Sequence, residues 1–190
     1  MSDVVNSDEI DVSDNTVISD NGNDFQEETD LQVEVAVESL SGVEELSSES
    51  WEVLDSNERL NTLQNVENQM AEIQERPALE VISQDLPDTV FGGYNGQNIC
   101  INGNHLEGSQ PVDEMFDTIV HEGRHAYQDY AIENPGVVND NSITNAWAEN
   151  RGNYLSAELY GQEIYQSQPL ENDAWTYAEN IKNGVYENRE

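Results

Sequence analysis

Two histidines and a glutamate stand close together in the segment Thr118-Ile-Val-His-Glu-Gly-Arg-His-Ala-Tyr-Gln. His121 and His125 are four residues apart, so on a helix both imidazoles leave the same face, one turn apart. Two imidazole nitrogens at this spacing can bind one divalent metal ion, of which zinc is the first candidate. Glu122 can flank that ion without competing with either histidine, and it is placed to accept a proton from water. The pattern therefore predicts a hydrolytic zinc site.

A catalytic zinc site needs a third protein ligand and an open position for water. We expect Glu171 to be that ligand, because it lies in the first turn of a helix that Pro169 begins. Asp173 and Glu149 are the alternatives among the downstream carboxylates. His105 is the remaining histidine, but it lies in a Gly- and Asn-rich loop, where we expect it to contact substrate or solvent.

A helix must carry the two histidines and hold them against a core. Pro111 and the acidic pair Asp113-Glu114 favour a helix start. Asn134-Pro135-Gly136 breaks the helix after about Tyr130. The apolar face of this helix is expected to consist of Met115, Phe116, Ile119 and Ala126.

Further helices are expected on both sides of this one. Asp55 and Glu58 have the spacing of a capping box, and the helix that they begin ends at Arg76-Pro77. A later helix is expected over residues 143–159, and the final one runs from Pro169. Trp147, Tyr154 and Leu155 are predicted to point inward from the first of these helices. The final helix is expected to run through Trp175, Tyr177, Ala178 and Ile181.

A small antiparallel sheet is expected before the histidine helix. Residues 79–82 read as a short strand. Residues 90–94 and 97–101 read as a hairpin, because Asn95-Gly96 between them suits a type I′ turn. The fold class is therefore predicted to be α+β and mainly helical.

The charge of the chain is very uneven. Its 190 residues include 40 Asp and Glu but 6 Lys and Arg, for a net charge of −34. Residues 1–50 hold 15 acidic residues and no basic one, and Phe25 is their one aromatic residue. So little apolar surface predicts a disordered acidic leader, in which residues 31–43 could form a transient helix or a docking segment. We assign residues 51–190 to one folded domain that opens at Trp51.

The same charge excludes some partners and favours none strongly. An acidic surface repels phosphate backbones and anionic membranes, so we expect neither nucleic acid nor membrane as a partner. The single Cys100 excludes an internal disulfide. We find no signal peptide of the usual kind and no run of about 18 apolar residues. We therefore expect the cytoplasm, or export by a route independent of a signal peptide, and leave the oligomeric state open.

From the hairpin through His-Glu-Gly-Arg-His-Ala-Tyr-Gln to Gln-Pro-Leu-Glu-Asn-Asp-Ala, the chain resembles zincin-like metallopeptidase domains of bacterial polymorphic toxins and effectors. It is also similar, more distantly, to the gluzincins. The resemblance implies a zinc-dependent peptidase that cleaves a protein or peptide, with zinc bound by His121, His125 and Glu171. It implies Glu122 as the general base and the strand 97–102 as the edge of the substrate cleft.

Other side chains near the motif are expected to support the site. Zincins often use a Tyr or His that donates a hydrogen bond to the developing oxyanion, and we expect Tyr165, or failing that His105, to do so here. Arg124 is expected on the surface or paired with an acid behind the metal site. Asp129 follows His125 by one turn, so it either orients that histidine or faces water.

Two other functions fit the sequence. One is an acidic binding or adaptor protein, including a mimic of DNA, with a structural or degenerate metal site. The other is a hydrolase of a non-peptide substrate, because the motif determines how water is activated and not what is cleaved. A substitution of Glu122 separates the enzymes from the adaptor.

Overall fold

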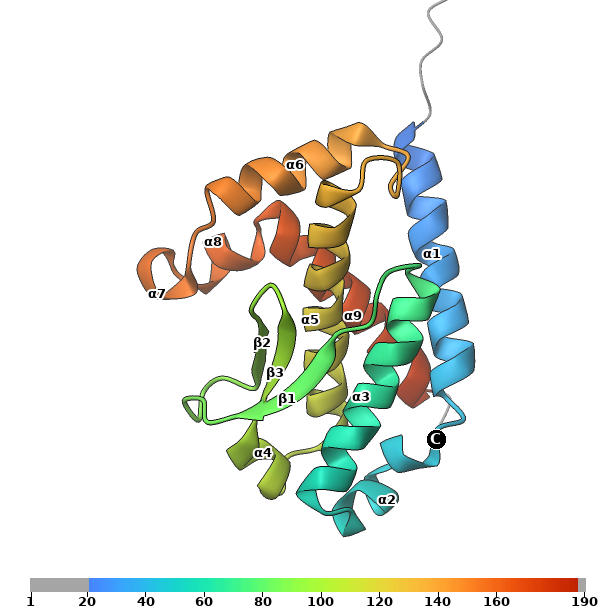
Figure 1. The fold of residues 1–190 in the computed structure, drawn as a ribbon, viewed down its shortest axis with the longest axis vertical. Coiled ribbons are helices and arrows are strands. Elements are labelled where there is room, and N and C mark those ends of the chain that lie inside the picture. Colours follow the sequence, from blue (N-terminus) through green and yellow to red (C-terminus); the bar gives the residue numbers. More distant parts are fainter. Residues whose placement is uncertain (1–20, 188–190) are drawn as a thin grey trace, which may run out of the picture.

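The computed structural model describes residues 21–187 of the chain as helices packed around and beside a small sheet (Figure 1). α5 (Val112–Glu133) runs through the middle, and α9 (Pro169–Glu187) and α3 (Ser56–Ile73) pack along it. The predicted α+β, mainly helical class is confirmed. The other elements are α1 (Asn21–Leu40), η1 (Glu44–Leu46), α2 (Ser48–Val53), β1 (Glu80–Gln84), β2 (Gly92–Tyr94), β3 (Asn98–Asn102), α4 (Gly103–Glu107), α6 (Asn141–Gly152), α7 (Ala157–Tyr160) and α8 (Gln162–Gln166).

The central helices begin where their sequences predict. Asp55 caps α3 by accepting hydrogen bonds from the backbone N–H groups of Asn57 and Glu58, both at 2.9 Å. The Glu58 carboxylate accepts the Asp55 N–H at 2.8 Å, which completes the capping box. α5 follows Pro111 and ends before Asn134. Its expected apolar face is buried, at Met115, Phe116, Ile119 and Ala126.

The acidic leader is folded from residue 21 onward, so the predicted disorder is wrong for residues 21–50. Residues 1–20 lie outside the described part of the chain. Ala36 and Leu40 of α1 are fully buried in the core. Apolar residues recur at helical spacing there, so one face of this acidic helix packs against α9 and α3. The folded unit therefore begins well before Trp51, and its leader contributes Val33, Ala36, Val37, Leu40 and Leu46 to the core.

The sheet is mixed, with strand order β1-β3-β2. β2 and β3 form the predicted antiparallel hairpin. β1 runs parallel to β3, with Val81 opposite Ile99, so the purely antiparallel sheet that we predicted is wrong. Residues 85–91 take the chain past β3 to the far edge, and the hairpin then returns it to the centre. The Asn102 side chain fixes this loop by donating hydrogen bonds to carbonyls of Leu86, Pro87 and Val90.

The helix predicted over residues 143–159 is shorter, because α6 ends at Gly152. Asn153 follows and donates a side-chain hydrogen bond back to a carbonyl of the last turn of α6 at 3.0 Å. α7 and α8 come next and project beside the sheet as an arm (Figure 1). Trp147 is buried as expected, whereas Tyr154 lies beyond the helix and is 46 % exposed.

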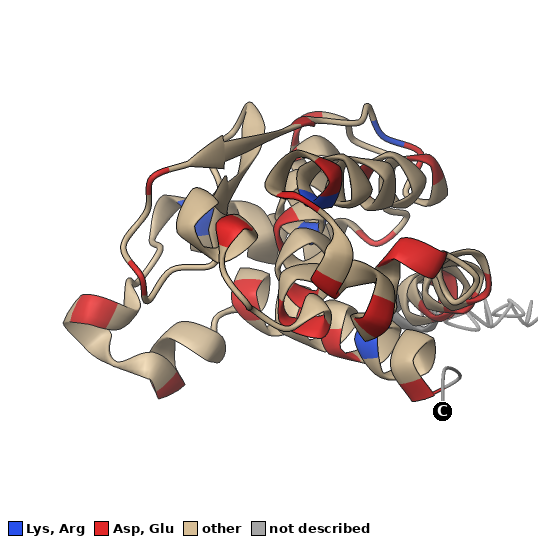
Figure 2. Ribbon diagram, turned by 90° about the horizontal axis from the view of Figure 1, so that it is seen from below, with Lys and Arg blue, Asp and Glu red and all other residues tan. Residues whose placement is uncertain are grey.

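Acidic residues are spread over the described helices, and basic residues are few among them (Figure 2). Of the basic residues in the described part, Arg59, Arg76 and Arg124 are buried. Arg151 and Lys182 form ion pairs nearer the surface. Within residues 21–187 no helix combines the length and the apolar character needed to cross a membrane.

Candidate metal centre

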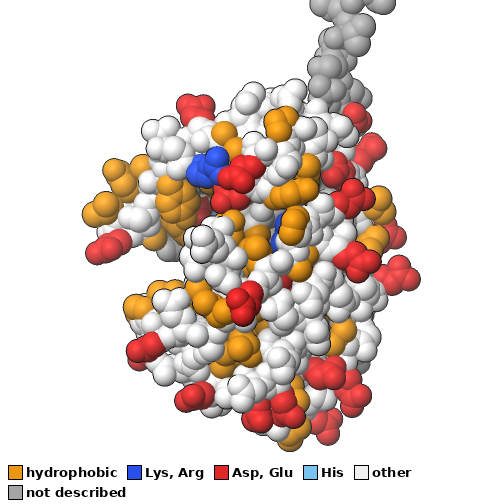
Figure 3. Space-filling view, viewed as in Figure 1, with side chains coloured by type: hydrophobic (Ala, Val, Ile, Leu, Met, Phe, Trp, Pro, Cys, Tyr) orange, Lys and Arg blue, Asp and Glu red, His pale blue; other side chains and the backbone are white. Residues whose placement is uncertain are grey.

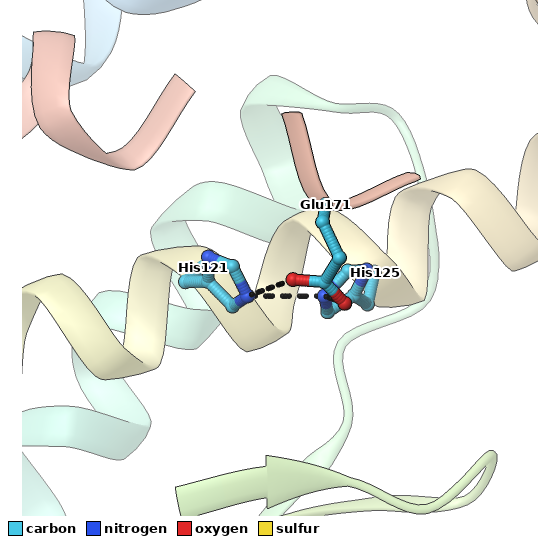
Figure 4. Close-up of side chains that lie close together, drawn as sticks. All are labelled: His121, His125 and Glu171. Atoms are coloured by element: carbon cyan, nitrogen blue, oxygen red, sulfur yellow. Dashed lines mark hydrogen bonds and ion pairs between the residues drawn. The ribbon is translucent and has the colours of Figure 1, made fainter. Parts of the chain in front are cut away.

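Three side chains from two helices meet beside the central helix. His121 and His125 leave one face of α5, and Glu171 reaches them from the first turn of α9 (Figure 4). α5 and α9 pack closely along their lengths, and the fully buried Ala174, one turn after Glu171, lets the two helices approach. The structure therefore brings the three expected ligands together.

The distances between these side chains fit a tetrahedral metal site. The Nε2 atoms of His121 and His125 are 3.0 Å apart. Glu171 Oε2 lies 3.4 Å from His121 Nε2, and Glu171 Oε1 lies 3.4 Å from His125 Nε2. Zinc bonds of about 2.0–2.1 Å at tetrahedral angles place neighbouring ligand atoms about 3.3–3.4 Å apart. Each of these three distances is within about 0.4 Å of this value, and one ligand atom from each residue lies within 4.8 Å of the other two.

The electrostatics of the cluster favour a bound cation. Burial alone would raise the pKa of Glu171, but its contacts with His121 and His125 hold that pKa well below its usual range. Burial would likewise lower the pKa of His125, but the bond to Glu171 and the charge of Glu122 raise it to about 9. Glu171 Oε2 is buried and accepts no hydrogen bond. A positive charge is therefore stabilised between these groups, and two nitrogens with one carboxylate oxygen are a donor set that suits zinc.

The cluster opens into a cavity of about 390 Å³. Glu122, half-buried, lines this cavity together with His125 and Glu171. Tyr165 also lines it. Figure 3 shows the surface hollowed between the α7–α8 arm and the sheet, on the side where this cavity lies.

Tyr154 is a site residue that the sequence analysis missed. It was expected in the core, but its hydroxyl donates a short hydrogen bond to Glu171 Oε1. Its ring lies 6.0 Å from that of Tyr165, at 90°. Burial and the nearby Glu171 raise the pKa values of both tyrosines, so both hydroxyls stay protonated and can donate. Its position follows from the early end of α6, which the sequence signalled by Gly152 and Asn153.

The other candidate ligands lie elsewhere. Asp173 points to Arg124, and Glu149 is exposed on α6. His105 is 6 % exposed and hydrogen-bonds through Nε2 to the Asp88 carbonyl at 3.0 Å, so the expected contact with substrate or solvent is wrong.

Two residues near the motif, Arg124 and Asp129, pair with charged partners beside the site. Arg124 is fully buried and paired with Asp173, so its expected place on the surface is wrong and its pairing with an acid is right. Asp129 accepts a hydrogen bond from Arg151 at 2.9 Å at the edge of the cavity. His125 Nδ1 contacts Gln128 instead of Asp129, and no sequence signal singled out that glutamine.

The strand that borders the cavity is β2. We expected residues 97–102 at the cleft edge, but β3 is the central strand of the sheet. Gly92, Gly93 and Tyr94 of the edge strand line the cavity. The hairpin returns the chain to the sheet centre, which exchanges the roles of the two strands.

Comparison with known proteins adds no family to this description. No family model matches the chain, no curated protein matches it, and no solved structure matches it. The function is therefore inferred from the geometry of the site.

Proposed function

We propose that the protein is a zinc-dependent metallopeptidase of the zincin type, as the sequence resemblance implies. By the same resemblance, we propose that it acts as a bacterial toxin or effector protease. One observation carries the proposal. His121, His125 and Glu171 meet at distances close to the edges of a zinc tetrahedron, and Glu122 lines the same cavity. A structural metal site would not need a carboxylate beside it that faces a cavity.

Zinc, when bound, would act as a Lewis acid that makes water a better nucleophile at neutral pH. Glu122 would accept the proton of that water as it attacks the scissile carbonyl, and would then return it to the leaving amine. Tyr165, which lines the cavity, would donate a hydrogen bond to the oxygen on which negative charge develops. Tyr154, whose hydroxyl donates to Glu171 Oε1, would orient that ligand.

The edge strand β2 supports a peptide over other substrates. An extended peptide can pair with an unpaired strand edge through main-chain hydrogen bonds. Gly93 leaves open space where a side chain would stand, which lets another backbone approach. The substrate we propose is therefore an extended segment of a protein or peptide, and nucleic acid stays an unlikely partner on grounds of charge.

Metal analysis combined with a peptidase assay tests the proposal. We expect about one zinc per wild-type chain, lost in His125→Ala and Glu171→Ala. Cleavage of a peptide library should disappear in Glu122→Gln, which keeps its zinc. A wild-type chain that takes up no zinc when offered it would contradict the proposal. Zinc uptake without any activity that depends on Glu122 would favour the acidic adaptor with a structural metal.

A further inference from the structure

Behind the proposed metal ligands, a chain of buried hydrogen bonds reaches His125. Gln128 is fully buried one turn along α5, and its Oε1 lies 2.8 Å from His125 Nδ1. Its Nε2 donates to the Leu170 carbonyl at 2.9 Å and to Asp173 Oδ2 at 2.7 Å. Both of these partners are acceptors, so the amide nitrogen must face them and the amide oxygen must face His125.

This orientation determines the tautomer of the histidine. Because Gln128 Oε1 can only accept, His125 Nδ1 must carry the proton. In the neutral ring, the lone pair then lies on Nε2, the atom that faces His121 and Glu171. Hydrogen bonds to the distal nitrogen are how proteins orient metal-binding histidines and raise their basicity.

A buried ion pair holds the glutamine in turn. Arg124 donates from Nε to Asp173 Oδ2 at 2.8 Å and from Nη2 to Asp173 Oδ1 at 2.9 Å. Its Nη1 donates to Gln32 Oε1 at 3.2 Å, which connects the pair to α1. The ring centroids of Tyr177 and Tyr127 lie 4.2 and 4.7 Å from the guanidinium carbon of Arg124. These contacts hold Arg124 in place. Arg124 in turn holds the Asp173 carboxylate where it accepts the hydrogen bond from Gln128.

The two histidines differ in this respect. His121 Nδ1 is buried without a hydrogen-bond partner, and its ring packs 4.8 Å from that of Trp175. The tautomer is therefore selected by hydrogen bonding at His125 and not at His121.

We propose that Gln128 is a positioning residue that selects the Nδ1–H tautomer of His125, and that the Arg124–Asp173 pair, anchored on α1, holds Gln128 in place. The inference rests on the proposed metal site. It predicts that zinc affinity depends on residues that touch neither metal nor substrate.

The test measures zinc affinity by competition with a chromophoric chelator, together with the visible spectrum of the cobalt-substituted protein. Gln128→Met keeps the length of the side chain but can neither accept from His125 nor donate to Asp173. We expect it to weaken zinc binding about 10–100-fold and to change the cobalt spectrum. Asp173→Asn keeps its shape and should act in the same direction. It also carries the test if Gln128→Met does not fold.

The chain offers a matched control in its second buried Arg–carboxylate pair. Arg76 donates to Glu67 at 2.7 and 2.8 Å, and this pair lies against Gly123, on the side of α5 away from the histidines. Glu67→Gln should lower thermal stability and leave zinc affinity unchanged. Wild-type zinc affinity in a folded Gln128→Met would overturn the positioning role, as would an equal loss in Glu67→Gln. A wild type that binds no zinc would overturn the metal centre itself.

Discussion

Zinc is expected to raise the melting temperature of the protein through the site formed by His121, His125 and Glu171. One ligand atom from each of the three residues lies within 4.8 Å of the other two, so the site is gathered before the ion binds. At free zinc of about 100 times the dissociation constant, binding to the native state adds about 2.7 kcal/mol. For a domain of this size, each kcal/mol corresponds to about 2–4 °C, so we expect a rise of about 5–11 °C.

Differential scanning calorimetry with and without zinc measures this shift. Glu171→Gln should lose most of it, because an amide oxygen is a poorer ligand than a carboxylate. Glu122→Gln should keep it, because Glu122 is not a ligand. The surface has many acids that bind zinc weakly, so Glu149→Gln, at an exposed acid away from the cluster, serves as the control and should keep the shift. Equal shifts in wild type and Glu171→Gln would refute the site.

Three further predictions concern the tyrosines of the cavity, the glycines of β2 and the buried carboxyl of Asp117. Tyr165→Phe should lower kcat about 10²–10³-fold in the peptidase assay, because it removes the donor proposed for the oxyanion. Tyr154→Phe should instead weaken zinc binding, because its hydroxyl bonds directly to a proposed ligand, and the opposite pattern would reverse the two roles. Gly92→Ala should lower the free energy of unfolding, measured in urea, by about 1–3 kcal/mol, because the new Cβ would lie 2.7 Å from a β3 carbonyl and from an α5 side chain. Gly93→Ala is the control, because its Cβ would have no atom within 4 Å. Burial raises the pKa of Asp117, so stability falls as pH rises between the unfolded and folded pKa values. Asp117→Asn should therefore melt higher than wild type at pH 7 and lose this advantage in acid, and an advantage independent of pH would contradict this account.

The elements that rest on local signals were predictable from the sequence. The capping box at Asp55, the hairpin at Asn95-Gly96 and the start of α5 each depend on residues a few positions apart. The spacing of His121 and His125 belongs to the same class, because a helix converts it directly into geometry. Glu171 could be predicted as the third ligand because Pro169 marks a helix start and places Glu171 in the first turn of that helix.

What the sequence hid depends on tertiary contacts. We predicted disorder for the residues of α1 because their composition is rich in acidic residues. Folding depends instead on one apolar face of the helix, which includes Ala36 and Leu40. Tyr154 reached the site because α6 ends early. Gln128 acquired its role from Asp173 and the Leu170 carbonyl, more than 40 positions away in the chain, and no local pattern encodes such a contact.

The acidity of the surface and the geometry of the site have separate origins. In the described part of the chain, three of the few basic side chains are buried: Arg59 donates to backbone carbonyls around α2 and α4, Arg76 pairs with Glu67, and Arg124 pairs with Asp173. An arginine stays charged when buried and offers several donors in fixed directions, so one side chain can bind several acceptors at once. Salt that screens the surface acids leaves such buried pairs largely unscreened. These three buried arginines therefore join elements inside the protein. Arg124 joins α5 to α9, the Arg76–Glu67 pair lies against Gly123 of α5, and Arg59 joins α3 to the segments around α2 and α4.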